Sequence, residues 1–153
     1  MLHDHQLWRS PAPDARHRLK AMDSETTRVL VIDDDPDALA LLRARLEHTG
    51  RFTVITAASG QAGLELARDM DPALIVCDIY MPGMGGADVA AALAADDNLR
   101  QIPLLFLSAL VKPDEIREHN GQIGGWPMAS KSESIHSIVR RIDTLLHRTR
   151  GRR

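Results

Sequence analysis

The chain has 153 residues, which is enough for one domain of ordinary size with a single hydrophobic core. Its formal net charge of -2 gives no overall attraction to nucleic acid or to anionic membrane surfaces, and its single cysteine, Cys77, cannot form an internal disulfide. No apolar stretch approaches the length of a membrane span, and the N-terminus lacks the apolar core of a secretory signal. We therefore expect a cytoplasmic protein that makes no membrane contact.

The first 27 residues differ from the rest of the chain. They contain three histidines, two prolines, many charges and no sustained periodicity, so they cannot bury enough apolar surface to offset the entropy lost on ordering. We expect a disordered or loosely docked N-terminal extension at residues 1–27, a folded domain at 28–148 and a basic tail at 149–153.

From residue 28 onward, short apolar runs alternate with amphipathic segments. Strands are predicted at 29–32, 52–57, 74–78, 102–107 and 128–130. Helices are predicted at 36–48, from a Ser59 cap to the Asp71-Pro72 break, at 86–95, at 113–120, and after a Ser132 or Ser134 cap through Leu146. Five strands that alternate with five helices predict an α/β fold, with a parallel sheet covered by helices on both faces.

Polar side chains stand where four of the predicted strands end. These residues are Asp33 and Asp34, Asp78, Ser108, and Lys131. The carboxyl ends of parallel strands form one edge, where open α/β sheets bind ligands. Carboxylates crowded there repel each other unless a cation neutralises them, and their oxygens suit Mg²⁺. Asp78 can then act as a nucleophile toward phosphorus, while Ser108 and Lys131 can bind phosphoryl oxygens.

These segments resemble the receiver domain of two-component response regulators, including the chemotaxis single-domain regulator. The resemblance rests on Val-Leu-Val-Ile-Asp-Asp-Asp-Pro at 29–36, Ile-Val-Cys-Asp-Ile-Tyr-Met-Pro-Gly-Met-Gly-Gly at 75–86, Leu-Leu-Phe-Leu-Ser-Ala at 104–109, and the lysine at 131. It covers about residues 28 to 148. It implies a flavodoxin-like fold with strand order 2-1-3-4-5.

The resemblance also implies a function. Asp78 is expected to accept a phosphoryl group from a histidine kinase or a histidine phosphotransfer protein, with Ser108 and Lys131 assisting. Mg²⁺ is expected on Asp33, Asp34, Asp78 and the main-chain carbonyl of Tyr80. No enzymatic activity is expected beyond the chain's own phosphorylation and dephosphorylation.

The expected output is a protein contact. Because no output domain follows residue 153 in this sequence, we expect the phosphorylated chain to bind a downstream protein target. The resemblance implies that the face made by helix four, strand five and helix five meets this partner or a second copy of the chain. Arginines near the C-terminus suit the negative end of a helix, so nucleic acid is not an expected partner.

Two positions depart from the family pattern. Ser132 follows Lys131, where the family has a proline in a cis peptide, so we expect a trans peptide and a loop of altered shape. Met128 stands where the family has an aromatic residue. These departures keep open a phosphorylation-independent interaction domain as an alternative. A Mg²⁺-dependent hydrolase is a further alternative, but Tyr80 stands where such an enzyme would place its general acid.

Overall fold

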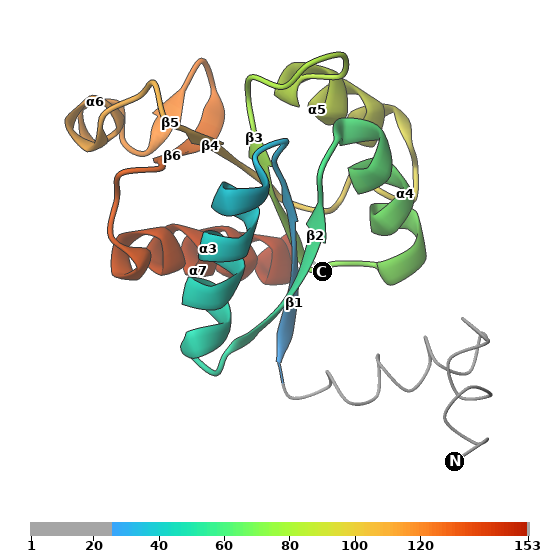
Figure 1. The fold of residues 1–153 in the computed structure, drawn as a ribbon, viewed down its shortest axis with the longest axis horizontal. Coiled ribbons are helices and arrows are strands. Elements are labelled where there is room, and N and C mark those ends of the chain that lie inside the picture. The colour runs from blue at the N-terminus through green and yellow to red at the C-terminus, as the bar shows by residue number, and fades with distance from the viewer. Residues whose placement is uncertain (1–25, 153) are drawn as a thin grey trace.

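The computed structural model describes residues 26–152, which form one six-stranded sheet with helices on both faces (Figure 1). The elements are β1 (Thr27–Ile32), α3 (Pro36–His48), β2 (Phe52–Ala57), α4 (Gly60–Met70), β3 (Leu74–Asp78), α5 (Gly86–Ala95), β4 (Leu104–Ser108), α6 (Pro113–Glu118), β5 (Gln122–Ile123), β6 (Trp126–Ser130) and α7 (Ile135–Arg152). No helix in this part of the chain is both long and apolar enough to cross a membrane.

The sheet confirms the predicted fold class and strand order. Its order is β2-β1-β3-β4-β6-β5, and the five predicted strands correspond to β1, β2, β3, β4 and β6, which pair in parallel. The sequence did not predict β5, a two-residue strand that pairs antiparallel with β6. Gly124 and Gly125 connect these strands with φ of +62° and +83°, which is the conformation that tight hairpin turns require.

Each face of the sheet has its own hydrophobic core. Helices α3 and α7 cover one face, while α4 and α5 cover the other (Figure 1). The first core contains Leu46 of α3, Ile142 of α7 and every second strand residue, such as Val29. The second contains Val89 of α5, Ile116 of α6 and the strand residues between those, such as Leu30. The apolar strand runs are therefore buried on both faces, which explains their lack of alternation.

Several predicted boundaries shift in the structure. Helix α6 ends at Glu118 rather than at residue 120, and Asn120 has a φ of +57° that is incompatible with a continuing helix. Ser134, rather than Ser132, caps α7, since its hydroxyl accepts the Ser137 amide at 3.1 Å. Helix α7 continues through Arg152, so the predicted tail at 149–153 is largely helical. The predicted N-terminal extension lies outside the described residues up to position 25, and Thr27 already belongs to β1.

Candidate phosphoacceptor site

The carboxyl ends of four strands bring the predicted site residues to one edge of the sheet. Asp33 directly follows β1, Asp78 ends β3, Ser108 ends β4 and Lys131 directly follows β6. The strand register aligns them, since Asp78 pairs with Leu107, and Ser108 pairs with Ser130. The main chain fixes Lys131 beside β4, because its amide donates to the Ser108 carbonyl at 2.9 Å.

Three carboxylates form a cluster at this edge. Asp33, Asp34 and Asp78 each have an oxygen atom within 4.8 Å of the others. Asp33 and Asp78 are buried, whereas Asp34 is exposed. The third acid of the run, Asp35, instead caps α3, because its carboxylate accepts the Asp37 amide at 2.9 Å. Asp33, Asp34 and Asp78 thus form the cluster that the sequence predicted at this edge, whereas Asp35 belongs to the helix cap.

Lys131 lies against this cluster. Its Nζ is 2.6 Å from Asp33 Oδ2 and 3.5 Å from Asp78 Oδ2. Burial alone would lower the pKa of Lys131, but the Asp33 hydrogen bond and the two carboxylate charges raise it. Burial raises the pKa of Asp78; Lys131 opposes this effect and Asp33 adds to it. The ammonium therefore stays charged between two carboxylates.

The donor set of the cluster fits a divalent cation. The cluster has three carboxylates and Lys131 contacts two of them, so an excess of negative charge remains. The carboxylate oxygens are hard ligands of the kind that Mg²⁺ prefers. Asp34 is exposed, so the cation would keep access to water molecules as further ligands. Tyr80, whose carbonyl the resemblance adds to this set, follows Asp78 by two residues in the loop between β3 and α5.

Ser108 is buried and its hydroxyl proton is available. Its Oγ accepts the Leu110 amide at 3.1 Å, so the hydroxyl can still donate to an incoming oxygen. Tyr80 and Leu110 flank the site with exposed fractions of 65% and 72%. Neither side chain carries a carboxylate or an amide that could orient a water molecule for attack on a phosphoryl group.

The two departures from the family pattern have structural counterparts. No peptide bond in the described part of the chain is cis, so the predicted trans bond between Lys131 and Ser132 is confirmed. Met128 is buried beside Phe106 in the paired strands β4 and β6. Trp126 packs edge-on against Phe106, with 5.5 Å between ring centroids. An aromatic ring thus packs near the switch position, on a residue two places earlier in the chain.

Glu133 is a buried charged residue that the sequence interpretation missed. Its carboxylate accepts the Ser130 amide at 2.5 Å, the Ser137 hydroxyl at 2.6 Å and Arg141 Nε at 2.8 Å. Burial would raise the pKa of Glu133, but these donors and the Arg141 charge lower it. The available signal was the spacing of four residues between Glu133, Ser137 and Arg141, since residues four apart lie on the same side of a helix and Glu133 directly precedes the cap of α7.

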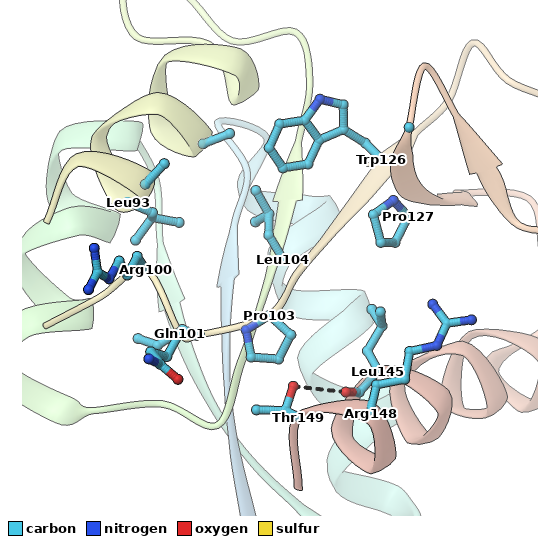
Figure 2. A pocket seen from close by; sticks show the side chains of 14 residues that line it. Leu93, Arg100, Gln101, Pro103, Leu104, Trp126, Pro127, Leu145, Arg148 and Thr149 are labelled. Atoms are coloured by element: carbon cyan, nitrogen blue, oxygen red, sulfur yellow. Dashed lines mark hydrogen bonds between the residues drawn. The ribbon is translucent and has the colours of Figure 1, made fainter. Parts of the chain in front are cut away.

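A separate apolar cavity lies away from the acidic cluster. It has a volume of about 420 Å³, and none of the predicted site residues lines it. Trp126 and Leu104 border it on one side and Leu145 and Arg148 on the other, as Figure 2 shows. This cavity is therefore not the site of the predicted chemistry.

Comparison with known proteins identifies the family. Residues 29–143 match the response regulator receiver domain, and the chain belongs to this family. It is 39% identical to the transcriptional regulatory protein PrrA of Mycobacterium tuberculosis over 83% of the chain and 54% of that protein. It is 34% identical to the polar-differentiation response regulator DivK of Brucella abortus over 79% of the chain and 97% of that protein. The chain thus spans about half the length of PrrA and nearly all of DivK.

Solved structures agree with this assignment. The receiver domain of the Francisella response regulator 1452 superposes with a TM-score of 0.65 at 26% identity, over 81% of this chain and 99% of that one. The chemotaxis protein CheY4 of Vibrio cholerae superposes with a TM-score of 0.65, over 78% of this chain and 98% of that one. Its identity of 22% supports the fold alone.

Proposed function

We propose that the chain is a phosphoacceptor module of a two-component phosphorelay. An oxygen of the Asp78 carboxylate attacks the phosphorus of a phosphohistidine on a histidine kinase or a histidine phosphotransfer protein. A P–O bond forms, the P–N bond breaks, and its electron pair returns to the imidazole nitrogen. The observation that carries this proposal is the convergence of Asp78, Lys131 and Ser108 at one edge of the sheet.

Each group has a defined part in this proposal. Lys131 donates to one phosphoryl oxygen as a point charge, and the Ser108 hydroxyl donates to another. Asp33, Asp34, Asp78 and the Tyr80 carbonyl would hold Mg²⁺, which supplies charge neutralisation at the phosphoryl oxygens when bound. In this site Lys131 already lies between Asp33 and Asp78, so little movement is needed for it to meet an oxygen on Asp78.

Phosphate-affinity electrophoresis after incubation with acetyl phosphate and Mg²⁺ tests this proposal. We expect the wild-type protein to show a shifted band, Asp78→Asn to show none, and Asp34→Asn to be labelled slowly. Asp35→Asn is the matched control, because asparagine caps helices as well as aspartate and Asp35 faces α3 rather than the cluster. Equal label on the Asp78→Asn protein would exclude Asp78 as the acceptor. No label on the wild type would favour a phosphorylation-independent interaction domain.

The proposed output is a change in the face made by α6, β6 and α7. Helix α6 has six residues, and Ile116 is its buried residue. The following Gly121, Gly124 and Gly125 all have positive φ. Short helices with few buried contacts open at low free-energy cost, which suits a surface that changes between two states. This face would meet a downstream protein or a second copy of the chain.

Hydrogen exchange with and without a beryllofluoride phosphate analogue, both in Mg²⁺, tests the output face. We expect altered exchange chiefly between Ser108 and Lys131, with a change in Trp126 fluorescence through its contact with Phe106. Changes confined to α3 and α4 would place the output elsewhere. A cytoplasmic location is part of the proposal and can be checked by cell fractionation.

A further inference from the structure

Glu133 occupies an unusual environment for a carboxylate. Its side chain is 3% exposed and accepts three hydrogen bonds, from Ser130, Ser137 and Arg141. A buried carboxylate is costly unless it is paired and fully hydrogen-bonded, and Arg141 supplies the opposite charge. Ser137 and Arg141 belong to α7 and Ser130 ends β6. Glu133 therefore joins the end of β6 to the last helix.

The contacts of Glu133 enclose Lys131. The Glu133 amide donates to the Ser130 carbonyl at 3.1 Å, while the Ser130 amide donates back to the Glu133 carboxylate. Ser132 adds a hydroxyl contact of 2.8 Å to the Ser130 hydroxyl. Lys131 thus lies inside a short turn that is closed on Ser130 from both directions. Such a turn fixes the direction in which the Lys131 side chain leaves the main chain, and from there Nζ reaches Asp33.

We propose that Glu133 is a positioning residue that orients Lys131 toward the phosphoacceptor, in a turn where this chain has Ser132 instead of proline. The inference rests on the proposed function for its catalytic consequence. Its structural part, the orientation of Lys131, stands on the contacts of Glu133 alone. The alternative is that Glu133 only anchors α7 and leaves Lys131 unaffected.

The same carboxylate ties this turn to the outer surface. Arg141 lines an open cavity of about 440 Å³ between α6, β6 and α7, and its Nη1 lies 3.1 Å from where a Cβ on Gly121 would be. Arg140 lines the same cavity and forms no ion pair within the described part of the chain, whereas its neighbour Arg141 pairs with Glu133. Arg141→Met should therefore resemble Glu133→Gln, whereas Arg140→Met removes an equal charge from α7 without touching the turn.

A first measurement reads the position of Lys131 directly. Each protein is treated with acetic anhydride, and mass spectrometry gives the labelling rate of Lys131 relative to exposed Lys112. We expect labelling of Lys131 to be about threefold faster in Glu133→Gln and in Arg141→Met, because less of the amine is then held by Asp33. Arg140→Met should match the wild type. Unchanged labelling in the Glu133 and Arg141 variants would overturn the inference.

A second measurement reads the catalytic consequence. Phosphorylation by acetyl phosphate with Mg²⁺ should be about tenfold slower in Glu133→Gln, since small misplacements of a catalytic group are costly. In a Lys131→Met background the same substitution should have no further effect. An equal loss in both backgrounds would show that Glu133 acts through stability rather than through Lys131.

Folding and function are kept apart by two further controls. Urea unfolding verifies that each variant is folded. If Glu133→Gln does not fold, Ser137→Ala replaces it: this variant removes one hydrogen-bond donor to the Glu133 carboxylate and should give a smaller increase in Lys131 labelling. If the wild type itself takes no phosphoryl group on Asp78, the proposed function fails. The orientation of Lys131 is then decided by the acetic anhydride labelling alone.

Discussion

Replacement of Gly86 by alanine should destabilise the domain through a clash with the main chain that carries Asp78. A Cβ at Gly86 would lie 2.7 Å from the Asp78 carbonyl oxygen, 2.8 Å from Ile79 Cα and 2.9 Å from Phe106 Cε1. Two of these three atoms belong to the backbone, which cannot rotate away. Overpacking of this kind costs about 1 to 3 kcal/mol, against a helix-propensity gain of up to about 1 kcal/mol. The middle values of these two ranges give an expected net loss of about 1 to 2 kcal/mol.

Gly63→Ala is the matched control for this substitution. Its Cβ would meet three atoms of one side chain, Ile32, the nearest being Cδ1 at 2.3 Å. Rotation about χ2 moves Cδ1, and a small rotation about χ1 moves Cγ1, which would lie 2.7 Å away, whereas the backbone atoms at Gly86 have no such freedom. Alanine also favours the interior of α4, so the loss should be smaller than at Gly86.

Urea unfolding compares the two variants with the wild type, with an expected midpoint shift of about 1 M for Gly86→Ala at the slope of a small domain. A Gly86→Ala protein as stable as the wild type would show that a Cβ at position 86 does not clash with the main chain of Asp78 and Ile79.

Three further outcomes follow from the site. In the absence of Mg²⁺, Asp78→Asn should unfold at higher urea concentration than the wild type, by about 1 to 2 kcal/mol, because it removes one of three mutually repelling carboxylates. The stabilisation due to Glu133, measured as the difference from Glu133→Gln, should be full above its ordinary pKa of 4.5 and disappear as pH falls through its lowered folded value. A phosphorylated wild type should keep its label longer than Tyr80→Asn, Leu110→Glu, since the native pair cannot orient a water molecule; equal decay rates would contradict this shielding.

The sequence predicted the fold and the placement of the site because both depend on repeating local signals. Apolar runs bounded by Gly, Pro and acids marked the parallel strands, and strand ends then placed Asp33, Asp78, Ser108 and Lys131 at one edge. The boundary errors arose where the signal was weak. Helix α6 carries little apolar surface, so its end depended on the positive φ of Asn120, and the available signal was the Asn120-Gly121 pair, a dipeptide typical of turns.

The sequence could not show why glycine is required at a particular position. Gly83 and Gly86 both lie in the tract after Asp78 that the pattern marks as a turn. Gly83 has a φ of +73° with open space around its Cβ position, so it is needed for conformation. Gly86 has no positive φ and is needed because the chain returns against Asp78 and Phe106. Only tertiary packing distinguishes the two requirements.

Glu133 was missed for a related reason: its meaning depends on a turn and a helix together. An acid two residues after a lysine is ordinary on a protein surface, and nothing in the local pattern shows that this one is buried. Burial follows from the return of α7 across the sheet, which places Arg141 beside the turn. The spacing to Ser137 and Arg141 was visible, but it gains meaning only with that packing.

The two departures from the family pattern act on opposite sides of Lys131, and the structure explains why neither displaces it. Before Lys131, Met128 lies within β6 and pairs with Phe106 of β4. The register of β6 therefore places Lys131 at the same edge of the sheet regardless of the side chain at position 128. The amide of Lys131 then bonds to the Ser108 carbonyl, which fixes its main chain before position 132 is reached. On the far side, Ser132 and Glu133 close the turn with hydrogen bonds to Ser130. Strand register thus sets where Lys131 lies, while the turn after it fixes the direction in which its side chain leaves the main chain.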